Sequence, residues 1–166
     1  MAMNRERIAP RHTTLLGLAV ASLATLSHAT APAGHYTISS IRGVAVVNDT
    51  ATGLVWQQSV GGMRADGGAG LSSVSDARSY CTSLGDGWRL PSVEELQTIV
   101  DERAVNPAID VNAFPDTPLD YFWTGSSVYF SPLDPINGWW VHFGTGITGN
   151  TGGDEFITPG YVRCVR

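Results

Sequence analysis

Only two cysteines occur in this chain of 166 residues, and they lie far apart, at Cys81 and Cys164. In an exported protein an even cysteine count predicts a disulfide, which here would close a loop of about 83 residues. The loop-entropy model gives such a bridge roughly 4.5 kcal/mol of stability. The alternative is a pair of free thiols, so the prediction depends on whether the chain is exported.

The N-terminus predicts export. Three arginines among the first eleven residues precede a mainly apolar run, Leu15–Leu26, and small residues follow at Ser27 and Ala29. This is the pattern of a secretory signal peptide over residues 1–29. A membrane anchor is the alternative, but a bilayer-spanning helix needs about 20 apolar residues. We therefore expect a periplasmic or extracellular protein, with no stable membrane insertion after signal cleavage.

The mature chain is acidic. Without residues 1–29 it keeps seven arginines (10 − 3) and 14 acids (15 − 1), a net charge of about −7. A field of that sign repels nucleic acid, which is not an expected partner. The remaining length of about 137 residues fits one domain. We assign residues 30–43 to a short leader and residues 44–166 to the domain.

Five segments have the composition of strands. Val44–Val47 and Leu54–Gln58 are apolar and β-branched and flank the turn-rich NDTATG, which predicts a hairpin. Tyr121–Val128 is aromatic, and Tyr161–Arg166 predicts a terminal strand. In Trp139–Phe143 the pattern alternates, so Trp139, Val141 and Phe143 should face the core while Trp140 and His142 face away. We expect loops at Gly61–Gly70, Asn106–Tyr121, Ser131–Gly138 and Gly144–Gly153.

Two helices are predicted. Ser72–Leu84 begins at a serine cap and precedes Gly85, and its apolar residues fall on one face: Val74, Ala77, Cys81 and Leu84. The second starts in DGWRLPSVEEL, residues Asp86 to Leu96, where Ser92 lies three residues before Glu95, a capping-box spacing.

A catalytic interpretation of the same stretch competes, because it combines an arginine with paired carboxylates. Glu94 and Glu95 are adjacent, however, and adjacent side chains on a helix point about 100° apart. In the first turn both instead meet the positive end of the helix dipole. A buried Trp88 and an Arg89 in a structural pair complete the structural interpretation, which we favour.

Three segments together resemble a known family. TGLVWQ (52–57), WRLPSVEELQTIVD (88–101) and GWWVHF with the ending YVRCVR resemble the DUF1566 family, also called the Lcl C-terminal domain, over about residues 44–166. More distantly, the chain is similar to the C-type-lectin and formylglycine-generating-enzyme group. The resemblance implies an α+β, C-type-lectin-like fold with two helices, a small irregular, mainly antiparallel sheet and long loops. It also implies that the cysteine of the first helix pairs with that of the last strand.

No catalytic residues are assigned. The formylglycine-generating enzymes need reactive thiols, whereas both cysteines here are expected in the disulfide. TGSSV does not match the G-x-S-x-G elbow of serine hydrolases. His35 and His142 lack the spacing of zinc ligands.

Calcium is a weaker possibility that we do not adopt. Four loop residues carry the oxygen ligands that this ion prefers: Asp134, Asn137, Asp154 and Glu155. The lectin motifs E-P-N, Q-P-D and W-N-D do not occur. We favour solvated loop acids and expect no cofactor.

Surface aromatics are the remaining candidates for ligand binding. We assign Trp56, Trp88, Trp123 and Trp139 to the core and name three ligand-binding candidates: Trp140, His142 and Tyr129. The hypothesis is an exported, non-enzymatic binding module of the bacterial envelope, adhesive or carbohydrate-binding, whose ligand is an unidentified glycan or surface protein. The alternatives are an enzyme related to the formylglycine-generating group and a structural envelope protein without a soluble ligand.

Overall fold

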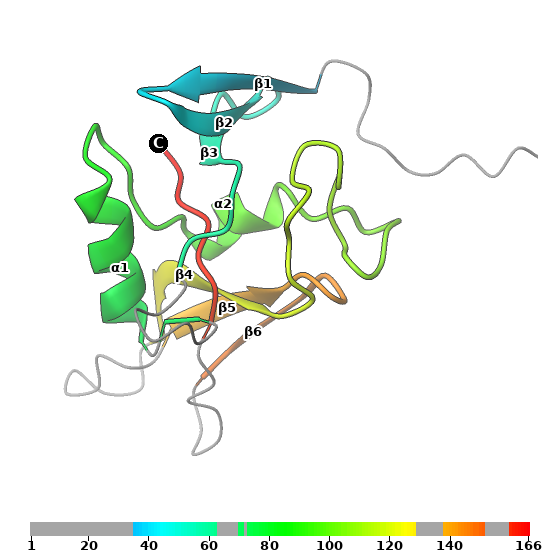
Figure 1. Ribbon diagram of the computed structural model, residues 1–166. Helices are drawn as coiled ribbons and strands as arrows, with labels where there is room; N and C mark the ends of the chain where they lie inside the picture. Colours follow the sequence, from blue (N-terminus) through cyan, green and yellow to red (C-terminus); the bar gives the residue numbers. More distant parts are fainter. Residues whose placement is uncertain (1–34, 63–69, 72, 129–137, 152–159) are drawn as a thin grey trace, which may run out of the picture.

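The computed structural model describes residues 35–62, 70–71, 73–128, 138–151 and 160–166. These residues contain six strands and two helices, in the order β1 (Tyr36–Ile41), β2 (Val44–Asp49), β3 (Val55–Gln57), α1 (Val74–Ser83), α2 (Val93–Gln97), β4 (Tyr121–Ser127), β5 (Gly138–His142) and β6 (Ile147–Asn150). The strands form two antiparallel sheets of three, β1-β2-β3 and β4-β5-β6. Figure 1 shows the sheets at opposite ends of the molecule, with α2 between them. The α+β class is confirmed, but the strands divide into two sheets where one was expected.

The first sheet begins within the segment assigned to a leader. β1 lies inside residues 30–43 and pairs with β2 along its whole length, in a register that places Ile38 opposite Val47. Arg42 and Gly43 make the turn between them with positive φ angles of 50° and 84°, as a type I′ hairpin turn requires. The predicted hairpin of β2 and β3 is confirmed. β1 was not predicted, because YTISSI has only two aliphatic residues and little apolar alternation.

The second sheet contains two predicted strands and one that was missed. β4 and β5 fall where expected, whereas β6 lies in the predicted turn region, so that prediction is wrong for residues 147–150. The register places Trp140 opposite Gly149 and His142 opposite Ile147. The sequence ITGN lacks an apolar alternation that would identify a strand. It forms one because its backbone pairs with β5.

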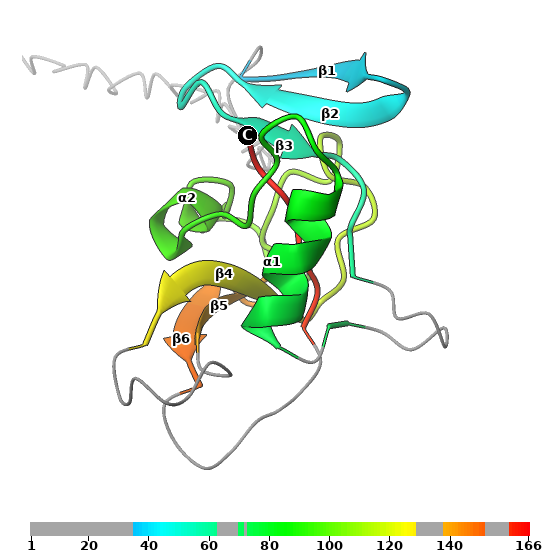
Figure 2. The same cartoon turned by 90° about the vertical axis from the view of Figure 1, so that its left-hand side faces the viewer.

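α1 confirms the first predicted helix. The Ser73 side chain accepts a hydrogen bond from the Asp76 backbone N–H at 3.1 Å, which caps the start. The helix ends at Ser83, with Leu84 as its C-cap, and Gly85 follows with a φ of 69°. Figure 2 shows α1 beside β4, against which it packs. Its buried residues are Val74, Ala77 and Cys81.

The disulfide is present. Cys81 of α1 bonds to Cys164 across 83 positions of sequence, with their Cα atoms 5.5 Å apart. Both cysteines are fully buried. Such a bond indicates an oxidising compartment, as the predicted export requires. The signal peptide itself lies outside the described residues. Among those residues, no helix is long and apolar enough to cross a membrane.

The DGWRLPSVEEL segment is the corner that starts α2. Ser92 Oγ accepts from the Glu95 backbone N–H at 3.2 Å, and the Glu95 carboxylate accepts from the Ser92 N–H at 2.8 Å, so the predicted capping box is confirmed. The same carboxylate receives two hydrogen bonds from Arg89, at 2.7 and 2.6 Å, which hold the pKa of Glu95 below its ordinary range. Trp88 is buried beside them. The unusual composition of this stretch is therefore explained by a helix start.

The C-terminal segment, residues 160–166, runs between the two sheets (red in Figure 1). Where a terminal strand was predicted, it makes isolated β-bridges, with Val165 joining Trp56 and Arg89 and Val162 joining Gly61. Core residues cover it on two sides. One cluster gathers around α1 and contains Val46, Val74, Ala77, Cys81, Trp88, Leu90, Trp123, Val162 and Cys164. The other surrounds α2 and contains Val47, Trp56, Val93, Leu96, Ile99, Ile109, Ala113, Phe114, Phe122, Val141, Phe143 and Val165.

Arg163 is an exception to strand alternation, because it is fully buried like its neighbours. Its guanidinium lies over the Phe114 ring, 4.5 Å from the centroid. It donates to the carbonyl oxygens of Gln57, at 3.0 Å, and of Gln58, and to Thr117 Oγ1 at 2.9 Å. Burial lowers the pKa of Arg163 to about 9, so the side chain is still charged at neutral pH.

Candidate functional site

Three partly exposed aromatic side chains share the face of β4 and β5 that turns away from the Phe122–Phe143 core; Trp123, opposite Trp140 in the register, lies on the same face but is buried in the cluster around α1. We call Tyr121, Trp140 and His142 the aromatic face. Tyr121 lies directly opposite His142 in the register, and their rings meet edge to face with centroids 4.7 Å apart. The Tyr121 and Trp140 rings meet in the same way, also at 4.7 Å. All three side chains are partly exposed, so they form a connected aromatic surface that solvent reaches.

The strand next to β5 fixes the Trp140 ring. A Cβ added at Gly149 of β6 would lie 2.4 Å from the indole Cζ2, so the ring rests directly on the glycine backbone. His142 is held similarly, because its Nδ1 lies 3.2 Å from Thr145 Oγ1 and a Cβ at Gly144 would lie 2.7 Å from its ring. The aromatic face is therefore ordered before any ligand arrives, which lowers the entropic cost of binding.

The opposite side of β5 behaves as the alternation predicted. Val141 is fully buried, and so is Phe143, the residue that follows the strand. Trp139 packs against the same core cluster but is only half-buried. The other three tryptophans assigned to the core, Trp56, Trp88 and Trp123, are buried. Trp139 and Trp140 therefore point to opposite sides of the sheet, as expected.

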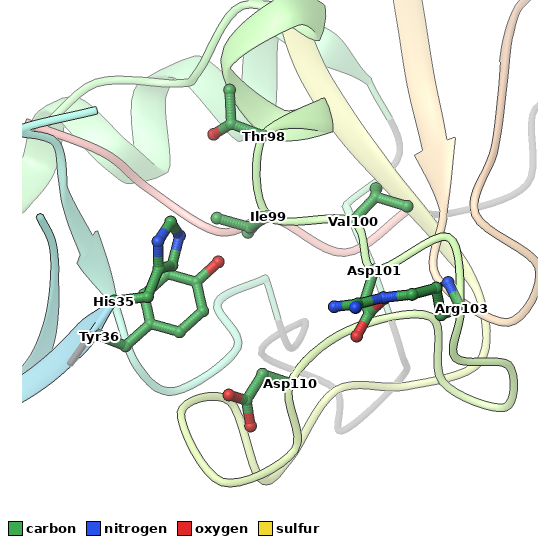
Figure 3. A pocket seen from close by; sticks show the side chains of 8 residues that line it. All are labelled: His35, Tyr36, Thr98, Ile99, Val100, Asp101, Arg103 and Asp110. Atoms are coloured by element: carbon green, nitrogen blue, oxygen red, sulfur yellow. The ribbon is translucent and has the colours of Figure 1, made fainter. Parts of the chain in front are cut away.

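A second candidate site is a hollow of about 140 Å³ beside the start of β1. Figure 3 shows its lining residues: His35, Tyr36, Thr98, Ile99, Val100, Asp101, Arg103 and Asp110. Its size is close to the roughly 150 Å³ of an engineered cavity that holds benzene, so it could take a group no larger than one side chain. The sequence did not predict it because its residues come from the leader, from the end of WRLPSVEELQTIVD and from a loop, which only the fold brings together.

The two aromatic residues that line the hollow, His35 and Tyr36, are fixed by contacts with neighbouring side chains. The Tyr36 ring packs edge to face on Phe114, with centroids 5.4 Å apart. His35 directs its Nε2 to the buried Asp49, 3.3 Å from Oδ1. Burial, followed by three nearby carboxylates, raises the pKa of the Tyr36 phenol above its ordinary value. The phenol therefore remains protonated and serves as a hydrogen-bonding group.

The acidic residues of the hollow take part in local structure. Asp101 Oδ1 accepts from the backbone N–H of Arg103 at 3.0 Å and lies 3.3 Å from its Nε. Asp110 Oδ1 accepts from the backbone N–H of Asn112 at 2.8 Å. In each carboxylate, one oxygen is thus engaged in a hydrogen bond within the local turn. The hollow thus offers a phenol, an imidazole and two carboxylates, but its acids are not arranged around a histidine in the manner of a catalytic pair.

A comparison with protein-family models gives one match, to the Lcl C-terminal domain, over residues 45–166. The chain belongs to the Lcl C-terminal domain family. Neither curated proteins nor solved structures gave a significant match.

The segments that carry this family resemblance meet in the structure. The Arg89 corner and the C-terminal segment of the Lcl C-terminal domain join through a bridge from Arg89 to Val165. β4 joins the same corner, since the Gly125 N–H donates to the Pro91 carbonyl oxygen at 2.7 Å. These two motifs thus hold the framework together, whereas the third, GWWVHF, supplies Trp140 and His142 of the aromatic face. The aromatic face lies on β4 and β5, next to this framework.

Several predicted site residues fall where the structure gives no description. The ligand-binding candidate Tyr129 lies outside the described residues. So do the four calcium candidates, Asp134, Asn137, Asp154 and Glu155. Among the residues that are described, no group of three or more His, Cys, Asp or Glu side chains could hold a metal ion. Of the three ligand-binding candidates, the structure thus brings together Trp140 and His142 and adds Tyr121, which sequence analysis had placed only in a strand.

Proposed function

We propose that this Lcl C-terminal domain is an exported, non-enzymatic binding module that holds a glycan on the aromatic face. The observation that supports the proposal most is the fixed, partly exposed Trp140 ring, supported by Gly149 and flanked by Tyr121. A half-buried tryptophan in a soluble domain offers an apolar surface with an N–H donor at its edge. This combination suits a flat ligand that presents both C–H and O–H groups.

The neighbours of the indole favour a sugar over a purely apolar ligand. The Tyr121 ring contacts both the indole and the His142 imidazole, and Thr145 Oγ1 lies 3.2 Å from His142 Nδ1, so this neighbourhood offers two hydroxyls and an imidazole that can donate or accept hydrogen bonds. The pyranose ring has one apolar face and a rim of hydroxyls, which matches this arrangement. Because only one indole is available, a single site would bind weakly. Display of many copies on a surface would make weak binding effective, as an adhesive function requires.

The fold is compatible with the C-type-lectin-like comparison made from the sequence. α1 is tied to the C-terminal segment by the disulfide, and long connections separate α2 from β4 and β4 from β5. We propose that this similarity extends to ligand binding on the β4-β5-β6 side of the molecule. The oxidised disulfide supports action in the periplasm or outside the cell.

An enzyme is the competing hypothesis, and the hollow is its best location. His35 and two carboxylates line it, yet His35 faces Asp49 and the carboxylates hold local turns. An enzyme related to the formylglycine-generating group would also use a reactive thiol, whereas both cysteines of the described residues are in the disulfide. We therefore expect His35→Gln to leave ligand binding unchanged.

A glycan array probed with the mature protein tests the proposal directly. We expect a small set of related glycans to bind the wild-type chain, Trp140→Phe to bind more weakly, and Trp140→Ala to lose the signal. Val105→Ala, which removes an exposed apolar side chain in a loop, is the matched control and should bind like the wild type. Repeating the array with calcium and with a chelator shows whether the ion contributes. Equal binding by Trp140→Ala would refute the proposed site, and an array without any signal would favour a structural envelope protein.

A further inference from the structure

β1 forms the outer margin of the first sheet. It pairs with β2 on one side, and no other strand within the described residues pairs with its second side. Figures 1 and 2 both show it at the end of the molecule, away from the core. Four of its six residues are exposed, and Ile38 exposes 56% of its surface.

This edge lacks the features that usually protect an edge strand. Natural proteins place charges, proline or a bulge on such strands to prevent pairing with another chain. β1 (YTISSI) contains no charged residue and no proline, and its pairing with β2 runs in continuous register without a bulge. A regular, uncharged edge of six residues is able to accept another strand.

The hydrogen-bonding phase of the hairpin shows which backbone groups face outward. The Thr50 N–H donates to the His35 carbonyl oxygen at 2.9 Å, so positions 35 and 50 are a hydrogen-bonded pair. In an antiparallel ladder hydrogen-bonded pairs alternate with non-hydrogen-bonded ones. Residues 37, 39 and 41 therefore bond to β2, while the N–H and C=O groups of Tyr36, Ile38 and Ser40 point to the free edge.

We propose that β1 pairs antiparallel with β1 of a second copy, around a two-fold axis that passes beside Ile38. In this register Ile38 forms a hydrogen-bonded pair with Ile38 of the second copy, and Tyr36 pairs with Ser40 of that copy. The outward-facing N–H and C=O groups of all three residues, Tyr36, Ile38 and Ser40, are then hydrogen-bonded in both copies. Any other antiparallel register of the same two strands leaves at least one of them unpaired.

The side chains also favour a second copy as the occupant. The two-fold register brings the two exposed Ile38 side chains into apolar contact. It also places the hydroxyl of Thr37 opposite that of Ser39 of the second copy. No charge lies within the paired strands. Near the edge, Asp49 is buried, Arg42 pairs with Asp86 at 2.9 Å and Arg103 with Asp101 at 3.3 Å, while Asp110 accepts a backbone hydrogen bond in its own turn. The overall acidity of the chain therefore opposes this contact only weakly.

Pairing through β1 would leave the aromatic face free. Figure 1 places β1 and the β4-β5-β6 sheet at opposite ends of the molecule. A dimer would thus carry two aromatic faces at its far ends. The pairing itself does not depend on the proposed function, but if that function holds, the dimer would be a bivalent binder able to bridge two surfaces.

Sedimentation equilibrium of the mature protein, combined with amide hydrogen exchange, tests the proposal. We expect a concentration-dependent dimer in which the amides of Ile38 and Ser40 become protected as the dimer forms. Ile38→Pro removes an outward-facing N–H and the Ile38 side chain but no hydrogen bond to β2, and should weaken dimerisation at least tenfold with an unchanged circular dichroism spectrum. Ile38→Lys should do the same and should regain part of its dimer in high salt, because the two lysines would face each other. Val105→Lys places the same charge on an exposed residue outside β1 and should dimerise like the wild type.

Three results would overturn the proposal. A chain that remains monomeric with unprotected Ile38 and Ser40 amides would show that the edge stays open. A monomer with these amides protected would show that the chain's own N-terminal segment covers it. A dimer whose Ile38 and Ser40 amides still exchange freely would show that another surface makes the contact.

Discussion

Replacement of Arg163 by methionine is expected to destabilise the domain strongly. The arginine is fully buried, and its guanidinium donates to the carbonyl oxygens of Gln57 and Gln58 and to Thr117 Oγ1. Methionine keeps most of the volume and the contact with the Phe114 ring but provides no donor. The buried carbonyl group of Gln57 and the partly buried one of Gln58 would therefore lose a partner.

The magnitude follows from these contacts. Each buried acceptor left without a partner costs about 1–3 kcal/mol, so the two carbonyls together cost about 2–6 kcal/mol. The loss of the cation over the Phe114 ring adds about 1–2 kcal/mol. Two effects act in the opposite direction. The substitution releases a desolvated charge, and Arg163 Nε has no acceptor among the described residues. We expect a net loss of about 3–5 kcal/mol in the free energy of unfolding, because the two opposing effects offset part of the cost of the lost hydrogen bonds and ring contact.

Urea unfolding followed by tryptophan fluorescence, with the disulfide intact, measures this loss as a lower midpoint at an unchanged m-value. Thr117→Val should cost less, and its cost should shrink further in the Arg163→Met background, because both changes break the same hydrogen bond. Arg78→Met, on the exposed side of α1, is the matched control and should change stability by less than about 0.5 kcal/mol. If Arg163→Met were as stable as the wild type, the reasoning would be refuted. The hydrogen bonds of Arg163 to the Gln57–Gln58 backbone would then not stabilise the C-terminal segment.

Three further predictions concern the framework. Cys81→Ala and Cys164→Ala should each lower stability, by roughly 4.5 kcal/mol in the loop-entropy model, and the double variant should be no worse than either; two reactive thiols in the native oxidised protein would contradict the bridge. Ser92→Ala should cost about 1 kcal/mol in thermal unfolding, whereas Glu94→Gln should cost little; a loss of ligand binding with unchanged melting on Glu94→Gln would instead reveal a functional carboxylate. The pKa of Glu95 is lowered in the folded state by its arginine partner, so its stabilising effect is present above its ordinary value of 4.5 and lost as pH falls through the lowered folded pKa. Glu95→Gln should therefore flatten the acid side of a stability-against-pH curve, and identical curves would refute that assignment.

The elements that were predictable from the sequence are those with strong local signals. α1 and α2 carry serine caps and an apolar face, and the Ser92–Glu95 capping box has the expected geometry. The alternating pattern of β5 correctly separated Trp139 from Trp140. Export chemistry correctly predicted the disulfide. In each case the information lies within a few neighbouring residues or in residue chemistry that is independent of the fold.

The elements that were missed depend on contacts distant in sequence. β1 and β6 have weak apolar patterns, and each becomes a strand because a better-patterned neighbour supplies hydrogen bonds. Arg163 occupies a position that alternation would direct to solvent, yet acceptors more than 45 residues away in sequence surround it. Tyr121 joins the aromatic face only through the pairing of β4 with β5. Local patterns contain no information about any of these partners.

The central claim is that Trp140 holds the ligand while Trp139 supports the fold. Isothermal titration of an array-selected glycan into the wild type, Trp140→Ala and Trp139→Ala, with melting curves of all three, tests it most directly. We predict that Trp140→Ala lowers affinity at least tenfold and melts like the wild type, while Trp139→Ala melts at a markedly lower temperature. Full affinity in Trp140→Ala, or a loss of stability in that variant equal to that of Trp139→Ala, would contradict the account.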